Sequence, residues 1–206
     1  MRRVLLLLGV LLVTSAASRA GMAVGDPRAM PHRDGLTGQL LVAEPTLDDP
    51  NFVHTVVLIV QHDDAGALGL VVNRPYGTAP TKELLSRLGV EAGKVTGDTL
   101  LFYGGPVQPT VGMVVHSTDY AMAETRRVTA DLAVTSNPTI LADIAAGKGP
   151  KRYVPVLGYA GWAPDQLEQE LAQGAWAVIP ADPELIFAPD VAKAWERAIA
   201  RKGTDL

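Results

Sequence analysis

One uninterrupted apolar stretch constrains the fold of this chain more than any other feature. Residues 54–61 (HTVVLIVQ) are mostly β-branched and apolar at consecutive positions, which is typical of a strand buried on both faces. The turn at 62–66 (HDDAG) separates this stretch from a second one at 67–73 (ALGLVVN). So short a connection predicts an antiparallel hairpin. We expect the core positions of the hairpin to be Val56, Leu58, Val60, Leu70 and Val72.

The rest of the chain is richer in strands early and in helices late. Further strands are predicted at 39–43, 99–103, 112–116, 127–134, 153–159 and 176–179. Helices are predicted at 82–88, 138–146, 164–173 and 190–202. Because strands and helices do not alternate regularly, the pattern predicts an α+β fold. We expect a single compact domain with a mixed, mainly antiparallel and curled sheet flanked by helices.

The first twenty residues have the three regions of a secretory signal peptide. A basic start, Met1–Arg3, precedes an apolar run at 4–13 and a segment of small residues. Ser18 and Ala20 suit the −3 and −1 positions of a cleavage site. We therefore expect residues 1–20 to be removed and the mature protein to be periplasmic. The apolar run is too short to span a bilayer comfortably, so no transmembrane segment is expected in the mature chain.

An alternative start of translation would change this location. If Met22 or Met30 is the true start, the protein lacks the signal and remains cytoplasmic. Residues 21–36 combine Gly, Pro and charge without periodicity, which predicts a flexible leader. The folded domain is then expected to cover residues 37–206.

Composition and charge exclude several classes of function. The chain has no cysteine, which excludes disulfides, thiolate metal sites and cysteine nucleophiles. It has 18 basic and 22 acidic residues, a formal charge of −4, so direct nucleic-acid binding is disfavoured. The short motifs of zinc proteases, serine hydrolases, P-loop proteins and dinucleotide-binding proteins are absent. We therefore expect neither a metal site nor a cofactor, and the oligomeric state stays open.

Polar residues at the ends of predicted strands are candidates for a functional site. His62 and Asp63 follow the first apolar strand, and His116 ends a later one. Histidines near a carboxylate suit acid–base chemistry or zinc binding. The alternative is structural: Asp63 caps the turn through the local backbone, and His62 makes a local hydrogen bond.

Asn73 and Arg74 end the second apolar strand and admit two interpretations. A guanidinium at a strand end can bind a carboxylate or phosphate ligand. It can equally form an internal clamp on a carboxylate of this chain, for which the candidates are Asp48, Asp49 and Asp63.

Two glycine-rich segments complete the candidates. Gly104 and Gly105 can present backbone N–H groups to an anion, or they can simply permit a sharp turn. Tyr159 and Trp162 lie among glycines, where their rings either cover a ligand or pack in the core. Because they lie at strand ends or junctions, we expect four turns to converge on one region: His62–Asp63, Asn73–Arg74, Gly104–Gly105 and Tyr159–Trp162. The polar residues of the following helix are expected to face solvent: Gln166, Glu168, Gln169 and Glu170.

An ordered series of segments resembles a known bacterial family. The segments are GQLLVAEPTLDDPNFVHTVVLIVQHDDAGALGLVVNRP, YGGPV, GMVVH, LGYAGWAPDQLEQEL and AW, and they resemble the YqgE/AlgH family, UPF0301. The resemblance implies one compact domain with a bifurcated, barrel-like sheet. It implies no established catalytic residue, cofactor or substrate, and the family's label as a transcriptional regulator comes with no known DNA-binding surface.

The chain departs from the family pattern at a few positions. His54–Thr55 replaces the usual Arg-Ser, Val111 replaces a basic residue, and Asp165 replaces a glycine. The first two changes weaken any anion site that would use those basic side chains. The predicted export signal is a further departure, since the family is usually cytoplasmic.

Two classes of function follow from these observations. The first is a non-catalytic binding or regulatory protein whose turns form a surface for an unknown protein or small-molecule ligand. The alternative is a hydrolase or transferase that uses His62, Asp63, Arg74 and His116 around a pocket. Direct DNA binding is weaker than either, because no predicted helix has the basic face of a recognition helix.

Overall fold

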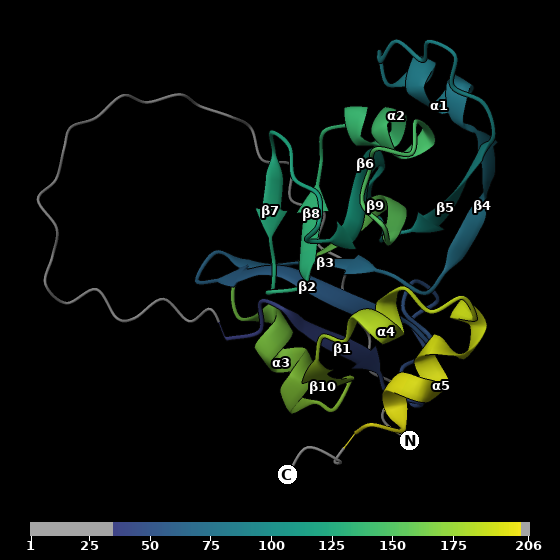
Figure 1. The fold of residues 1–206 in the computed structure, drawn as a ribbon. Helices are drawn as coiled ribbons and strands as arrows, with labels where there is room; N and C mark the ends of the chain where they lie inside the picture. The colour runs from purple at the N-terminus through teal and green to yellow at the C-terminus, as the bar shows by residue number, and fades with distance from the viewer. Residues whose placement is uncertain (1–34, 203–206) are drawn as a thin grey trace, which may run out of the picture. The chain divides into compact units, whose positions relative to one another are not determined.

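Strands β2 (Val56–Asp63) and β3 (Gly66–Val71) form the hairpin that the two apolar stretches predict (Figure 1). In the computed structural model, which describes residues 35–202, the two strands pair antiparallel with Leu58 opposite Leu70. All five positions predicted for the core are at most 4% exposed, so that prediction is confirmed. The predicted signal peptide and the leader up to residue 34 lie outside the described residues.

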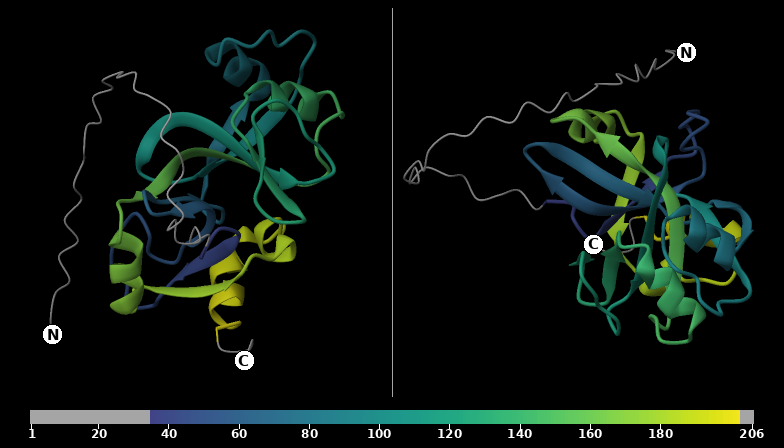
Figure 2. Two further views of the ribbon diagram at one scale, coloured as in Figure 1. Left: turned by 90° about the vertical axis from the view of Figure 1, so that its left-hand side faces the viewer. Right: turned by 90° about the horizontal axis from the view of Figure 1, so that it is seen from above.

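Ten strands of the described chain form one strongly curled sheet, as the two views of Figure 2 show. Its order is β10-β1-β2-β3-β9-β6-β8-β7, with the β4–β5 hairpin attached to β9 through β5. Every pairing is antiparallel except that of β5 with β9. The remaining strands are β1 (Gln39–Ala43), β4 (Pro75–Pro80), β5 (Asp98–Tyr103), β6 (Val107–Ser117), β7 (Thr125–Arg127), β8 (Leu132–Thr135), β9 (Tyr153–Trp162) and β10 (Trp176–Pro180).

Strand β9 belongs to both halves of the sheet. Its second half pairs with β3, and its first half lies between β5 and β6. Gly158, with φ +73°, lies where β9 passes from one half to the other. A Cβ added to Gly104 would lie 2.3 Å from the Gly158 carbonyl oxygen. The two glycine-rich motifs therefore permit the close approach of two backbones.

Both faces of the β1–β2–β3 layer are buried, as the uninterrupted apolar stretch predicts. On one face, Leu58 packs in a core shared with the C-terminal helices and the other half of the sheet. On the opposite face, Ile59 packs in a core with Trp162 and Leu167. Burial on both faces explains why neighbouring residues of β2 are all apolar.

The helices differ in part from the prediction. They are α1 (Thr81–Arg87), α2 (Thr139–Ala145), α3 (Gln166–Ala172), α4 (Pro183–Ile186) and α5 (Ala194–Ile199). The helix predicted at 190–202 is shorter, because a 3-10 turn at Val191–Lys193 precedes α5. The strand predicted at 127–134 is interrupted: Arg127 ends β7, residues 128–131 form the turn of the hairpin, and β8 begins at Leu132, whose carbonyl accepts from the Val128 N–H. Neither β4 nor α4 was predicted, since β4 contains two prolines and a glycine, which disfavour a strand, and α4 is only four residues long.

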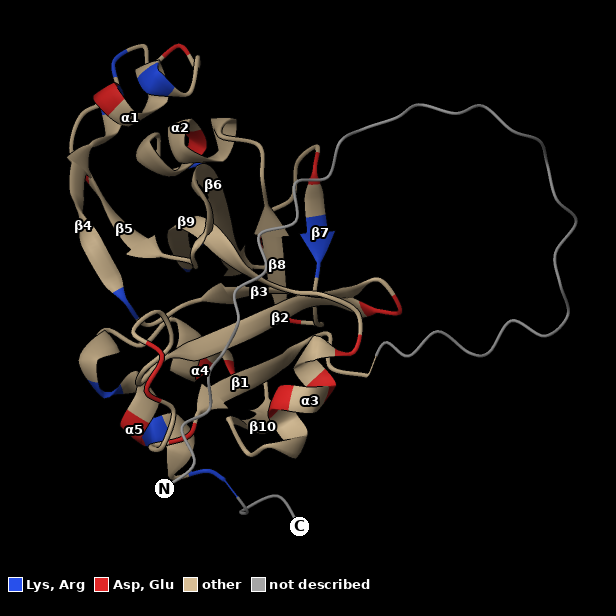
Figure 3. Cartoon of the chain, turned by 180° about the vertical axis from the view of Figure 1, so that it is seen from behind, with Lys and Arg blue, Asp and Glu red and all other residues tan. Residues whose placement is uncertain are grey.

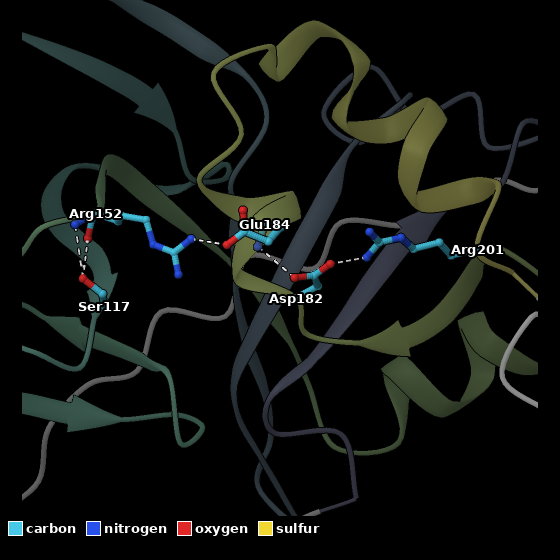
Figure 4. Close-up of polar contacts among 5 residues, drawn as sticks. All are labelled: Ser117, Arg152, Asp182, Glu184 and Arg201. Atoms are coloured by element: carbon cyan, nitrogen blue, oxygen red, sulfur yellow. Dashed lines mark hydrogen bonds and ion pairs between the residues drawn. The ribbon is translucent and has the colours of Figure 1, made fainter.

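A chain of polar contacts attaches the C-terminal helices to the sheet (Figure 4). Arg152, whose N–H donates to Ser117 Oγ, reaches from the start of β9 to Glu184 of α4. Asp182 accepts from the Glu184 N–H at 2.8 Å and pairs with Arg201. Burial alone would raise the pKa of Asp182, but the hydrogen bonds from Arg201 and the Glu184 N–H outweigh it and lower that pKa. These charges therefore have structural partners.

The close approach at Gly104 predicts a specific cost of adding one methyl group. Gly104→Ala places its Cβ against backbone that cannot rotate away, so we expect a loss of about 1–3 kcal/mol of unfolding free energy, or more. Gly112→Ala is the matched control, because its Cβ would meet nothing nearer than Leu157 at 3.9 Å. Urea unfolding monitored by circular dichroism measures both variants. Equal stability of the two would contradict the proposed role of Gly104.

Candidate functional site

A polar hollow of about 270 Å³ lies between the β2–β3 turn and α3. Acidic residues, red in Figure 3, lie on both of these elements. A smaller hollow of about 150 Å³ shares Asp63 with it and is lined by Leu68 and Trp162. The lining of the larger hollow consists of His62, Asp63, Asp64, Asp165 and Glu168.

His62 is the one buried residue of this lining, and it is 8% exposed. Its Nε2 lies 2.8 Å from Glu168 Oε1. A carboxylate only accepts hydrogen bonds, so Nε2 donates and carries the proton. Nδ1 is buried and has no hydrogen-bond partner among the described residues. The imidazole therefore joins the end of β2 to α3 and orients Glu168.

The two aspartates of the turn differ in their local roles. Asp63 Oδ1 accepts from the Ala65 N–H at 2.8 Å, and its Oδ2 accepts from Gln61 Nε2 at 2.7 Å. This confirms the predicted turn cap at Asp63. Asp64 is exposed at the tip of the same turn.

Helix α3 is held in place by a buried carboxylate. Glu170 is 8% exposed, and its Oε2 accepts from Trp162 Nε1 at 2.9 Å and from Trp176 Nε1 at 2.8 Å. The expectation that Glu170 faces solvent is therefore wrong. Its spacing from Leu167, three residues earlier, places it on the apolar face of the helix and was a signal that the sequence contained. This anchor positions Glu168 beside His62.

Of the two alternatives predicted for Asn73 and Arg74, the structure shows the internal clamp. Arg74 donates to three backbone carbonyls, those of Pro50, Asn51 and Val53, at 3.2, 2.9 and 2.8 Å. The partners are therefore carbonyls and not the aspartates that we expected. Asn73 Oδ1 accepts from the Val56 N–H, and its Nδ2 donates to the His54 carbonyl. Both side chains fold the loop before β2 onto the sheet.

His116 is buried in a separate place. Its Nδ1 lies 2.9 Å from the Ser117 carbonyl, to which it must donate, and its Nε2 lies 2.8 Å from Thr135 Oγ1. Burial lowers the pKa of His116 below the ordinary value, and the Ser117 carbonyl and Asp119 only partly oppose this effect. Both ring nitrogens thus have structural partners.

The predicted site residues therefore do not converge on one region. His62, Asp63 and Trp162 lie around the two hollows. Arg74 contacts residues before the start of β2, whereas His62 is near its end, about 20 Å away at the rise of a strand. Gly104, Gly105 and Tyr159 lie where the two glycine-rich segments contact each other. A Cβ on Gly105 would lie 2.1 Å from the Tyr159 carbonyl carbon. His116 has its own partners, so the residues of the hydrolase alternative do not surround one pocket.

Sequence patterns missed part of the lining. Glu168 was expected to face solvent, and Asp165 and Asp64 were not candidates. Asp165 has a left-handed backbone, with φ +62°, at the start of α3. The described residues contain no group of three or more His, Asp or Glu side chains arranged to hold a metal ion. No helix in this part of the chain is long and apolar enough to cross a membrane.

Comparison with known proteins decides the family. The AlgH-like family model matches residues 40–206. The chain belongs to the AlgH-like family, UPF0301. A UPF0301 protein of Methylococcus capsulatus is 42% identical over 170 residues, which are 82% of this chain and 93% of the relative. Another, from Afipia carboxidovorans, is 40% identical and covers 83% of this chain and 85% of its own.

A solved structure supports the same assignment. The solution structure of the AlgH protein from Pseudomonas aeruginosa has a TM-score of 0.70 and 36% identity, covering 88% of this chain and 93% of that one. A crystal structure of a Corynebacterium diphtheriae protein, with a TM-score of 0.67 and 23% identity, shares the fold. These likenesses confirm the predicted family and the curled α+β sheet. The names of these relatives assign no activity.

The Arg74 clamp predicts that a lysine cannot replace this arginine. One guanidinium reaches three carbonyls, whereas an ammonium lacks the planar fork, so we expect Arg74→Lys to lower the unfolding free energy by about 1–3 kcal/mol. Arg126→Lys is the matched control, because Arg126 donates to one side chain, that of Gln61. Thermal unfolding of both variants makes the comparison. If Arg74→Lys is as stable as its control, Arg74 is free for another role.

Proposed function

We propose that this protein is a non-catalytic binding protein and that the hollow between the β2–β3 turn and α3 is its ligand site. The observation that carries the proposal is the distribution of polar partners. Arg74, Asn73 and His116 are all engaged by the protein's own backbone or side chains. In the hollow, the carboxylates of Asp64, Asp165 and Glu168 are exposed at the surface, where a ligand can reach them. A regulatory role for the protein would then act through this ligand.

The His62–Glu168 pair favours one other candidate, a hydrolase in which the histidine activates water. A general base needs a free ring nitrogen in reach of the proton that it takes. The Nε2 of His62 already donates to Glu168, and its Nδ1 is buried. No serine, threonine or cysteine is among the residues that line the hollow. Binding is therefore the function that this geometry supports better.

Amide chemical shifts test the proposal with probes of different charge. Isotope-labelled protein is titrated with agmatine as a cation, citrate as an anion and trehalose as a neutral sugar. We expect one of these probes to shift signals of residues 62–66 and 165–168 while those of Arg74 and His116 stay in place. His62→Gln should remove the response without unfolding the protein.

Two results would contradict the proposal. One is turnover of p-nitrophenyl acetate or p-nitrophenyl phosphate that His62→Gln abolishes, which would indicate an enzyme. The other is the absence of any response in the hollow to all three probes.

A further inference from the structure

We infer that His116 is a pH-sensitive latch for residues 118–127, a segment that comprises the connection between β6 and β7 and strand β7 itself. While the imidazole is neutral, a directed chain of hydrogen bonds holds this segment against β8. A proton on the imidazole breaks the chain and releases the segment. None of the groups in the chain lines the proposed ligand site, so the latch is a separate feature of the fold.

The chain consists of four hydrogen bonds in series, all donated in one direction. His116 Nδ1 donates to the Ser117 carbonyl at 2.9 Å, so Nε2 of the neutral ring has no proton and accepts from the Thr135 hydroxyl at 2.8 Å. Thr135 Oγ1 in turn accepts from the Thr125 hydroxyl at 2.7 Å, and Thr125 Oγ1 accepts from the Met122 N–H at 3.0 Å. A carbonyl at one end and a backbone N–H at the other fix this direction.

Protonation of His116 leaves the chain with one hydrogen too many. The new Nε2–H points at Thr135 Oγ1, so the Thr135 hydroxyl has to turn and donate to Thr125. Thr125 Oγ1 then accepts from two donors, and its own hydrogen has no other partner among the described residues. An unpaired hydroxyl is unfavourable in the closed structure, and so is a charge on His116, which is 0% exposed.

The segment opens at β7, because the chain ends there on the strand with the fewest neighbours. Strand β8 pairs with both β6 and β7, whereas the three-residue β7 pairs in the described part of the chain with β8 alone (Figure 1). Glu124, directly before β7, has φ +67°, which residues other than glycine rarely adopt. Opening gives the Thr125 hydroxyl water as an acceptor, and it also separates Arg126 from Gln61 Oε1 of β2.

Burial sets the pH range in which the latch opens. Burial lowers the pKa of His116 in the closed structure, and the Ser117 carbonyl and Asp119 oppose this only in part. Once the segment opens, the imidazole regains its ordinary pKa of about 6.5, so protons bind more strongly to the open state. Opening therefore increases as the pH falls below about 6.5, and it stops increasing below the lower pKa of the closed state.

The titratable and charged groups around the imidazole come from four parts of the chain, and β8 contributes none. They are Asp119 and Tyr120 of the connection, Arg126 and Arg127 of β7, Asp143 of α2, and Lys151, Arg152 and Tyr153 before and at the start of β9. Burial and the hydrogen bond to Asp143 raise the pKa of Tyr120 to about 12, and the hydrogen bond from Ser117 lowers that of Asp119. Neither Tyr120 nor Asp119 therefore changes charge between pH 7.5 and 5.5.

Amide hydrogen exchange of Met122 tests the latch. The measured quantity is its protection factor, the intrinsic exchange rate divided by the observed rate at the same pH, relative to that of Leu58 in the core of β2. We expect this ratio to fall by up to about tenfold between pH 7.5 and 5.5, as an ordinary pKa of about 6.5 in the open state predicts. Nitrogen NMR of the imidazole should show Nδ1 alone protonated at pH 7.5, because the direction of the chain requires it.

Matched variants assign the pH response to His116. His116→Gln keeps a group that donates and accepts but does not titrate, so the ratio should be equal at both pH values. His54→Gln removes an exposed imidazole that contacts Trp195, and it should leave the fall unchanged. A second pair covers the case that His116→Gln does not fold. Thr125→Val removes the last hydroxyl, so Met122 should exchange rapidly already at pH 7.5, whereas Thr125→Ser keeps the hydroxyl and the pH response.

Four results would overturn the inference. One is a ratio that does not change with pH in the unaltered protein, and another is a fall that persists in His116→Gln. Equal loss of protection at Met122 and Leu58 would show that acid destabilises the whole domain and not this segment. A proton on Nε2 at pH 7.5 would show that the chain does not run in the stated direction.

Discussion

The contact between two backbones at Gly104 and Gly158 is the constraint on which the rest of this structure depends. It lets β9 pass from one half of the sheet to the other, so that a single strand pairs with β3, β5 and β6. A side chain on Gly104 would separate these halves. The C-terminal helices then complete the core on one face of the β1–β2–β3 layer, and α3 completes the core on its opposite face.

Most of the polar residues that could be taken for catalytic or ligand-binding groups instead stabilise this architecture. Arg74 holds the loop before β2, and His116 joins β6 to β8. Glu170 attaches α3 to the sheet through hydrogen bonds from two tryptophans. What remains is the end of the β2–β3 hairpin beyond the core, where the chain places carboxylates around His62. The proposed ligand site therefore lies outside the packed core, where fewer side chains are needed to stabilise the fold.

Apolar runs and turn residues in the sequence predicted the elements whose formation depends on neighbouring residues. The β2–β3 hairpin could be predicted because its strands are apolar on both faces and its turn is short. In contrast, the partners of Arg74 are carbonyls whose positions depend on a folded loop, and no spacing in the sequence encodes them. The contact of His62 with Glu168 joins residues far apart in the chain, so single-sequence patterns missed this half of the hollow. Family resemblance added the expectation of a bifurcated, barrel-like sheet but no site.

Amide chemical shifts of the isotope-labelled protein test the central claim most directly. The account predicts that a small polar probe shifts the signals of residues 62–66 and 165–168, which surround the hollow, while those of Arg74 and His116 stay in place. Shifts at Arg74 or His116 instead, or no response of the hollow to any probe, would contradict it.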